Sequence, residues 1–333
     1  MGILRPDNEM PTLHVLYTGG TIGSAGQPLK PMAGDEFSRL LDGVPGFAGH
    51  CLDGGEVAWT LSCLEPPLDS ADMAPPDWLR IARATLERSV GCDGVVILHG
   101  TDTLAWTAAA LSFLLAGMQI PVVLTGSQRP LAAAGTDAID NLRLALREAA
   151  GGRPGVRVAF GGQVLPATGV LKVDAAADAA FDAPRGRQSS AGDWADSAPS
   201  GRLVRIDPAV RVACLALYPG IDAATLGAVL AQPVSGLVVA AYGAGNAPSD
   251  EAFLATLRRA HERGVVIVVV TQALRGAVRL GEYQTGAGLA AAGAVSGGEL
   301  SPVAACAKLW VLCALGHSQS ETEALMQRSL VGE

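Results

Sequence analysis

The sequence lacks any block of basic residues. Its 24 Lys and Arg are outnumbered by 32 Asp and Glu, and the formal net charge is −8. A protein that binds nucleic acid needs a basic surface that neutralises the phosphates. The composition therefore excludes nucleic acid as an expected partner.

A hydrophobic run long enough to cross a membrane is also missing. The most apolar stretch, LAWTAAALSFLLAGMQIPVVLTG, is divided by Gly117 and Pro121 into pieces too short to span a bilayer. The N-terminal stretch MGILRPDNEMPTLHV lacks the apolar core of a signal peptide. We therefore expect a cytoplasmic protein with no membrane partner.

Metal-binding patterns are absent from the cysteines and histidines. The six cysteines form no C-x-x-C pair, and no His-Cys cluster has metal-ligand spacing. In a cytoplasmic protein we expect such cysteines to be reduced and mostly buried. His99, before Gly100 at a strand end, is interpreted as a core residue. No metal or organic cofactor is expected.

Three glycine motifs of known chemistry are missing as well. The chain contains neither G-x-G-x-x-G nor G-x-x-x-x-G-K-[ST], the signatures of dinucleotide and nucleoside triphosphate binding. It also lacks G-x-S-x-G, the nucleophile elbow of serine α/β-hydrolases. These absences argue against nucleotide binding and against a catalytic serine of that type.

What the chain does contain is an alternation of strand-like and helix-like segments over 333 residues. The strands lack strict polar–apolar alternation, which indicates a parallel sheet buried on both faces. We predict two α/β domains: a larger one at 1–190, with a mainly parallel sheet flanked by helices, and a smaller one at 205–333. The Pro, Gly, Ser and Asp content indicates a linker at 185–205.

The individual elements follow from apolar runs and helix-capping signals. Strands are predicted at 13–19, 94–100, 121–126, 156–162, 212–220, 234–243 and 264–272. Helices are predicted near 35–41, 75–89, 103–117, 136–150, 222–231, 250–263, 301–316 and 318–330. Thr136, Ser301 and Ser318 are the expected helix caps of three of them.

Two strand-to-helix elbows carry hydroxyl groups and a carboxylate. LHVLYTGGTIGS ends a predicted strand just before Gly20 and Thr21, and VVILHGTDTLAW ends another just before Thr101 and Asp102. Ligands of open α/β sheets lie beyond the carboxyl ends of the strands. Glycine lets the backbone approach a ligand closely there, and helix N-termini present N–H groups to developing negative charge. Either elbow alone is more often a turn with a helix cap than a functional site.

Taken together, the two elbows resemble the signature motifs of the bacterial-type L-asparaginases. The resemblance continues in order through LDSADMAPPDW, PVVLTGSQRP, GTDAIDNL, LKVDAAADAAFDAP, YGAGNAP and GLAAAGAVSGGELSPVAACAKL. Several segments, the last above all, are similar to the cytoplasmic type I branch. The resemblance implies an amidohydrolase that converts L-asparagine to L-aspartate and ammonia through a threonine-linked acyl-enzyme.

The same resemblance implies catalytic roles for four residues. Thr21 matches the nucleophile of the first signature. Thr101 and Asp102 match the second signature, in which the threonine assists catalysis and the aspartate holds the α-ammonium of the substrate. Lys172, in LKVDA, matches the lysine of a Thr-Lys-Asp relay. A nearby carboxylate favours its ammonium form and burial favours the neutral amine, so Lys172 either accepts a proton or organises the site.

The implied substrate-binding set extends beyond these residues. Ser70 matches the serine that binds the α-carboxylate, and Asn246 lies where a neighbouring subunit completes the pocket. We therefore expect a homodimer or homotetramer with sites at the interface. The full predicted binding set is Gly20, Ser70, Ala71, Thr101, Asp102, Ser127 and Asn246.

The sequence departs from the family pattern in the loop SAGQPLKPMAG. Family members commonly carry a tyrosine there as a partner to the nucleophile, whereas Leu29 stands near that place here. Tyr17 is expected to pack in the strand region instead. Either another group activates Thr21, or turnover is slow, or the loop excludes water by its bulk. Ala71 and Ala273 replace a glutamine and an allosteric cysteine of some members, so we expect no allosteric control of that kind.

Two alternatives to a dedicated asparaginase remain open at this point. A mixed asparaginase–glutaminase is one, because one methylene of substrate is worth only about 1–3 kcal/mol of discrimination. A non-catalytic amino-acid sensor or binding protein is the other, and the missing loop tyrosine is the feature that favours it.

Overall fold

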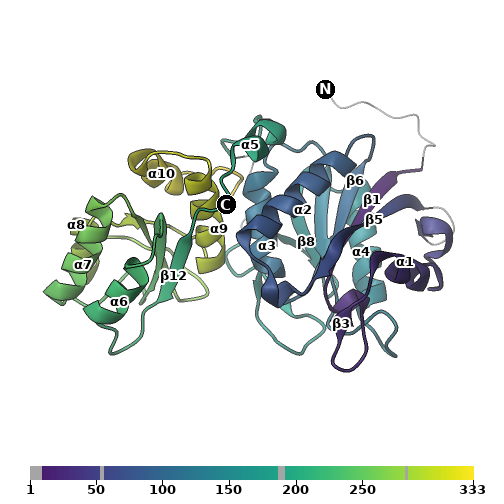
Figure 1. Ribbon diagram of the computed structural model, residues 1–333, viewed down its shortest axis with the longest axis horizontal. Coiled ribbons are helices and arrows are strands. Elements are labelled where there is room, and N and C mark those ends of the chain that lie inside the picture. The colour runs from purple at the N-terminus through teal and green to yellow at the C-terminus, as the bar shows by residue number, and fades with distance from the viewer. Residues whose placement is uncertain (1–9, 53–55, 187–191, 282–283) are drawn as a thin grey trace. The chain divides into compact units, whose positions relative to one another are not determined.

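The computed structural model describes residues 10–52, 56–186, 192–281 and 284–333, which form two compact units (Figure 1). The first unit comprises the described residues within Met1–Leu111, Gly117–Ala167 and Lys172–Asp182, and the second comprises those within Ser112–Ala116, Thr168–Leu171 and Ala183–Glu333. The main division thus falls just before the segment predicted as a linker. Within that segment, helix α5 occupies Pro199–Arg205, with its proline in the first turn, where it suits a helix start. Residues 187–191 of the same segment lie outside the described residues.

A seven-stranded sheet forms the centre of the first unit, in the order β4-β5-β1-β6-β7-β8-β9. Its strands are β1 (Thr12–Gly19), β4 (Cys51–Leu52), β5 (Val57–Leu68), β6 (Gly94–Leu98), β7 (Pro121–Thr125), β8 (Gly155–Phe160) and β9 (Gln163–Pro166). The five central strands, β5, β1, β6, β7 and β8 in sheet order, pair in parallel. The edge strands β4 and β9 pair antiparallel with their neighbours. The prediction of a mainly parallel sheet is confirmed.

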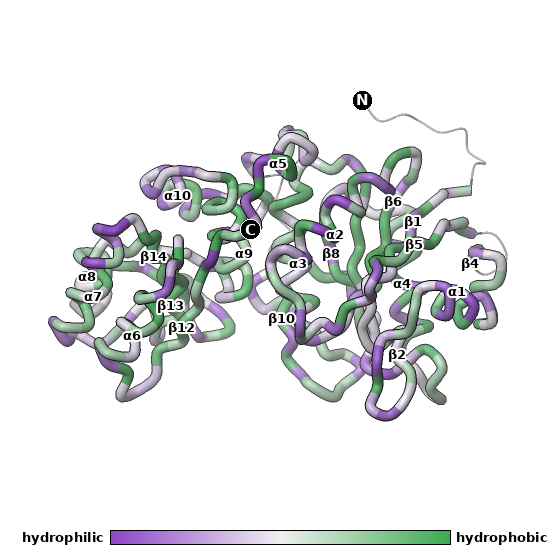
Figure 2. The backbone as a smooth tube through the Cα atoms, viewed as in Figure 1, coloured by the Kyte–Doolittle hydropathy of each residue, from purple (hydrophilic) through white to green (hydrophobic). Residues whose placement is uncertain are grey.

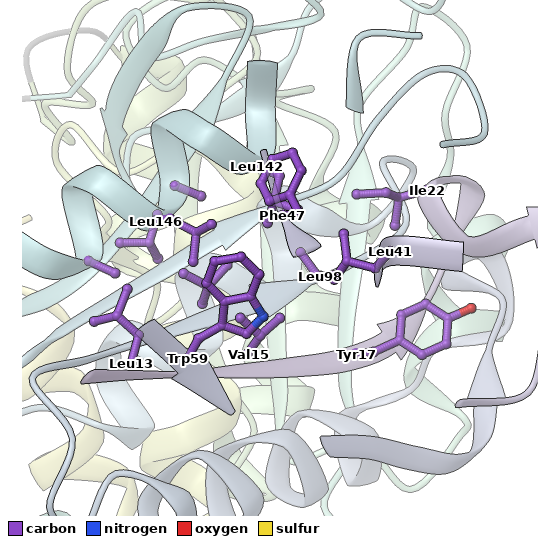
Figure 3. Close-up of a cluster of buried hydrophobic side chains, with 14 of the residues drawn as sticks. Leu13, Val15, Tyr17, Ile22, Leu41, Phe47, Trp59, Leu98, Leu142 and Leu146 are labelled. Carbon is purple, nitrogen blue, oxygen red and sulfur yellow. The ribbon is translucent and has the colours of Figure 1, made fainter. Parts of the chain in front are cut away.

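Four helices connect these strands and cover both faces of the sheet (Figure 1). They are α1 (Gly34–Asp42), α2 (Pro75–Arg88), α3 (Leu104–Leu114) and α4 (Ala138–Gly151). Alternate side chains of β1, from Leu13 to Tyr17, pack with Leu41 of α1 and Leu142 of α4 in one continuous core (Figure 3). All five residues of β6 are buried, and β6 and β14 are green in Figure 2, as expected for strands covered on both sides.

The second unit is built on four parallel strands in the order β12-β13-β14-β15. These strands are β12 (Val212–Ala216), β13 (Gly236–Ala241), β14 (Val266–Thr271) and β15 (Val295–Ser296), and the helices after α5 are α6 (Ala223–Leu230), α7 (Glu251–Glu262), α8 (Gln284–Ala291), α9 (Pro302–Ala314) and α10 (Gln319–Met326). Side chains of α6 and α7 share a core with alternate residues of β13 and β14. This smaller α/β unit agrees with the predicted fold class.

Helix caps follow the sequence signals at two of the three predicted positions. Ser301 Oγ accepts the Ala304 N–H, and Ser318 forms a capping box with Glu321. The helix α4 differs, because its cap position is Asp137 rather than Thr136. The Asp137 carboxylate accepts N–H groups of the preceding loop instead of its own helix, which leaves the Thr136 hydroxyl to accept the Ala138 N–H.

Three sequence expectations concern features spread over the whole chain. All six cysteines are free. Cys306 is buried, Cys214 is exposed and the other four are partly buried, so the expectation of mostly buried thiols is wrong. Within the described ranges, no group of three or more His, Cys, Asp or Glu side chains could hold a metal ion. Across the same part of the chain, no helix combines the length and apolarity that crossing a bilayer requires.

Candidate functional site

The two elbows lie against each other at the carboxyl ends of β1 and β6. These strands are parallel neighbours, so the segments that follow them meet at one edge of the sheet. Gly20 has φ +84°, and a Cβ added to it would lie 2.3 Å from the Gly100 nitrogen. The first elbow therefore packs backbone against backbone on the second, and only glycine allows this approach.

Thr21 follows directly and opens a short 3₁₀ turn, Thr21–Gly23. The turn is fixed from both sides, because Ser24 Oγ donates to the Gly20 carbonyl and the Leu131 N–H donates to the Ile22 carbonyl. Ile22 is fully buried, whereas Thr21 is only partly buried. The sequence thus anchors the turn and leaves the threonine beside the elbow contact.

Ser70 joins the elbows from the end of β5. It begins a 3₁₀ turn, Ser70–Asp72, that Asp69 caps by accepting the Ala71 N–H. Ser70 is 3% exposed, and a Cβ on Gly100 would lie 2.4 Å from Ser70 Oγ. Gly20 and Ser70 therefore flank Gly100. Ala71 itself is exposed at the surface of the turn.

Lys172 connects both side chains of the second elbow. Its Nζ donates to Thr101 Oγ1 at 3.0 Å and to Asp102 Oδ1 at 2.8 Å. Lys172 ends the short strand β10 (Leu171–Lys172), which pairs with β11 (Phe181–Asp182). Thr101 is 5% exposed, whereas the Asp102 side chain is 63% exposed. The result is a lysine, a threonine and an aspartate in one hydrogen-bonded group, with the carboxylate open to solvent.

The segment after β7 contains the predicted residue Ser127 and, next to it, Gln128, which the sequence does not single out. Ser127 is fully buried, and its hydroxyl donates to the Arg129 carbonyl. Gln128, the next residue, accepts a hydrogen bond from Thr101 Oγ1 at 3.3 Å. The signal that could have found Gln128 is its place just after a strand end, the same position that made both elbows candidates.

Tyr17 supports the base of the loop that lacks a tyrosine. Its ring is fully buried and stacks on Phe37, with centroids 4.2 Å apart. Its hydroxyl donates to the carbonyls of Gly23 and Met32 at 3.1 and 3.2 Å. Burial is the main cause that raises the pKa of this phenol. Tyr17 therefore holds the two ends of the loop together, as expected for a residue that packs in the strand region.

The loop itself is an antiparallel hairpin of β2 (Ser24–Ala25) and β3 (Lys30–Pro31). Leu29 at its tip is 52% exposed. The hairpin therefore presents an apolar side chain near the place where family members are expected to carry a phenol.

Asn246 belongs to the second unit. It lies in the turn that follows β13, where its main-chain N–H and carbonyl exchange hydrogen bonds with those of Tyr242. Gly245 in the same turn has φ +114°, a conformation that favours glycine. The turn thus holds Asn246 in a defined backbone position.

His99, between β6 and the second elbow, is a buried neutral residue. Its Nδ1 lies 2.7 Å from the Gly100 carbonyl, and burial lowers its pKa to about 4. The unfolded chain, with a histidine pKa near 6.5, therefore binds more protons between about pH 4 and 6.5. The contribution of neutral His99 to the free energy of unfolding is fully present above about pH 6.5 and is lost as the pH falls to about 4.

We predict that His99→Gln flattens the acid side of the stability profile. A shift from 6.5 to about 4 corresponds to about 3 kcal/mol, which the wild-type chain loses between pH 7 and pH 4 and the variant does not. Urea unfolding at a series of pH values measures this difference. The partly exposed His317, changed to Gln, is the control, and an H99Q profile parallel to that of the wild-type chain would contradict the prediction.

These features define a two-unit α/β protein with a strand-end site of threonine, lysine and aspartate side chains. Family models for "Asparaginase, N-terminal" and "Glutaminase/Asparaginase C-terminal domain" match residues 12–193 and 211–326. The chain belongs to the asparaginase family.

Individual relatives agree with this placement over nearly the full length. The chain is 36% identical to L-asparaginase 1 of Escherichia coli K12, with 97% of each chain covered, and 36% identical to the L-asparaginase of Thermococcus kodakarensis, with 96% and 98% covered. Its structure is similar to that of the Thermococcus enzyme, with a TM-score of 0.83 at 32% identity over 97% of this chain and 98% of that one. L-asparaginase I of Vibrio cholerae gives the same TM-score at 34% identity, with 98% and 99% covered.

Proposed function

We propose that this chain is an L-asparaginase, which converts L-asparagine to L-aspartate and ammonia. The observation that carries the proposal is the hydrogen-bonded group of Lys172, Thr101 and Asp102 in a chain of the asparaginase family. The contact between Gly20 and Gly100 supports it, because it brings the Thr21 elbow to the same edge of the sheet.

In the proposed reaction, Thr21 Oγ1 attacks the side-chain amide carbon of asparagine. A hydroxyl is a weak nucleophile, so its proton passes toward the Thr101–Lys172 pair as the bond forms. The amide nitrogen takes up a proton and leaves as ammonia, and an aspartyl ester on Thr21 remains. Water then attacks this ester, which releases aspartate and restores the hydroxyl. Main-chain N–H groups at the glycine elbows stabilise the oxyanion of each step.

Recognition of the zwitterionic substrate is assigned to groups on both sides of this threonine. The exposed carboxylate of Asp102 binds the α-ammonium group, and Ser70 with nearby main-chain N–H groups binds the α-carboxylate. Any contact from Ser127 or Ala71 comes through main-chain atoms, because the Ser127 hydroxyl is engaged and Ala71 has no polar side chain. Holding the amide in this orientation removes several kcal/mol of the barrier.

The oligomer is part of the same proposal. We assign to Asn246 the role of completing the pocket of a neighbouring copy, in a homodimer or homotetramer. Light scattering gives the mass of the assembly. Mixing inactive Thr21→Val chains with Asn246→Ala chains is expected to restore part of the activity, because some mixed pockets then contain both intact residues. A monomer that is fully active would contradict the assignment.

An ammonia assay with asparagine and glutamine under identical conditions tests the activity. We expect asparagine to be preferred by about 10–200-fold in kcat/KM, the range that one methylene supplies. Equal rates on both amides would indicate a mixed asparaginase–glutaminase instead.

A non-catalytic amino-acid-binding protein is the second candidate, and the exposed Leu29 in a hairpin without tyrosine favours it. Calorimetry that detects aspartate binding, with no ammonia released from either amide, would establish that alternative and overturn the proposed activity.

A further inference from the structure

Gln128 is held in place more firmly than a surface glutamine needs to be. Its side-chain amide nitrogen donates to the carbonyls of Ala175 and Ala177 at 3.1 and 3.2 Å. Its main-chain N–H donates to the buried carboxylate of Asp137 at 2.9 Å. Carbonyl oxygens only accept, so the two contacts of the nitrogen settle which way the amide faces. The remaining amide oxygen, Oε1, faces Thr101.

The hydroxyl of Thr101 contacts one hydrogen-bond donor and one hydrogen-bond acceptor. Lys172 Nζ donates to the hydroxyl oxygen at 3.0 Å. Gln128 Oε1 has no hydrogen, so the 3.3 Å contact between them requires Thr101 to donate. A hydroxyl carries one hydrogen, and Gln128 therefore holds that hydrogen on the side away from Lys172. The oxygen lone pairs of Thr101 are left for Lys172 and for the substrate side of the elbow.

Gln128 lies between two hydrogen-bonded loops, the one after β7 and the one between β10 and β11. Asp137 also accepts the Arg129 N–H at 3.0 Å and the Asn141 side-chain amide at 3.1 Å. On the other side, Asp174 accepts the N–H groups of Ala176 and Ala177. An exposed ion pair of Arg129 and Asp178, at 2.8 Å, joins the same two loops without touching Thr101. The loop after β7 and the loop between β10 and β11 are thus joined at two places, by Gln128 and by the Arg129–Asp178 ion pair. Of these two contacts, only Gln128 also bonds Thr101.

We propose that Gln128 is a positioning residue that orients the Thr101 hydroxyl for acyl transfer. The proposal rests on the proposed amidohydrolase activity and deepens it. With its hydrogen held by Gln128, the Thr101 oxygen is ready to accept the proton that Thr21 loses. Thr101 takes up the proton of Thr21 and gives one proton to the amide nitrogen as ammonia leaves, so Thr101 ends the step as a neutral hydroxyl. Orientation of this kind acts on the chemical step and leaves substrate affinity largely unchanged.

Three variants separate orientation of the hydroxyl from a role in holding the two loops together. Gln128→Met removes both the acceptor for Thr101 and the donors to Ala175 and Ala177, whereas Gln128→Glu keeps an oxygen toward Thr101 but loses those donors. Asp178→Ala removes only the exposed ion pair with Arg129. We expect kcat of Q128M to fall about tenfold with KM within twofold of wild type, the effect of losing one hydrogen bond in the chemical step. Q128E is expected to stay within about threefold of wild type, and D178A near wild type.

The ammonia assay is run on the wild-type chain and the three variants, after thermal unfolding shows each to be folded. Wild-type kcat in Q128M overturns the proposal. Equal losses in Q128M and Q128E, or a tenfold loss in D178A, also overturn it, because loop fastening then explains the effect. A wild-type chain that releases no ammonia overturns the proposed function instead, so the two failures are distinguishable.

Discussion

Replacing Thr21 with valine is expected to lower ammonia release from asparagine at least about a thousandfold. Valine has nearly the shape of threonine but carries no hydroxyl, so the chain loses the proposed nucleophile and little else. Removing a nucleophile reduces kcat and kcat/KM together, because the interaction exists only in the reaction. The side chain is partly exposed in a turn that other residues anchor, so the free energy of unfolding should change by less than about 1 kcal/mol.

A matched control lies three residues earlier, near the end of strand β1. Thr18 is fully buried, and its hydroxyl donates to the Leu98 carbonyl at 2.8 Å. Thr18→Val should cost about 1 kcal/mol of stability, the usual value of such a hydrogen bond, and should retain catalysis. Steady-state ammonia assays and urea unfolding on both variants give the comparison. Turnover at the wild-type level in T21V would show that another group is the nucleophile.

The largest effect on stability is expected at the buried ion pair of Lys308 and Glu333. Their side chains are 1% and 3% exposed, and the nitrogen and oxygen lie 2.6 Å apart. Lys308 also donates to the carbonyls of Met326 and Arg328, and Glu333 accepts the N–H groups of Leu330 and Val331. The pair therefore joins helix α9 to the segment that follows α10. Burial lowers the pKa of Lys308, and the attraction of Glu333 opposes this shift.

Glu333→Gln is expected to destabilise the chain by about 3–5 kcal/mol, because it leaves a buried ammonium without its counter-charge. The double variant Lys308→Met with Glu333→Gln should recover most of that loss, since no unpaired charge then remains. Neutralising one partner of the exposed pair Arg258–Glu251 should change stability by less than about 1 kcal/mol. Urea unfolding measures all three. A double variant as unstable as E333Q would show that shape, rather than charge, controls this contact.

The sequence was most informative where apolar runs are long and bounded by clear signals. Strand β6 and helices α7 and α9 lie where the patterns placed them, because burial and capping are encoded in neighbouring residues. The sequence predicts no helix at the position of α8, since QTGAGLAA has neither a strong apolar stripe nor a cap signal. Helix α5 falls inside the predicted linker, because its proline and serine are typical both of linkers and of helix starts.

The candidate site could be predicted only in part, for a different reason. Sequence patterns located both elbows, the resemblance to the asparaginases added Lys172, and the structure brings Lys172 to Thr101 and Asp102. The place of Gln128 just after a strand end marks it as a candidate, but its contacts could not be assigned, because they depend on carbonyl groups that lie 47 and 49 residues away in sequence. Long-range main-chain contacts leave no local signal in composition or spacing. The assignment of Asn246 stays a prediction.

The contact between Gly20 and Gly100 has a consequence for anyone who wishes to alter substrate range. Neither Gly20 nor Gly100 accepts a side chain, so substitutions at these two positions cannot add new groups to the contact between the elbows. In the proposed site, the segments left for admitting a longer or bulkier amide are the hairpin around Leu29 and the turn that begins at Ser70. Libraries for directed evolution are best concentrated on those two segments.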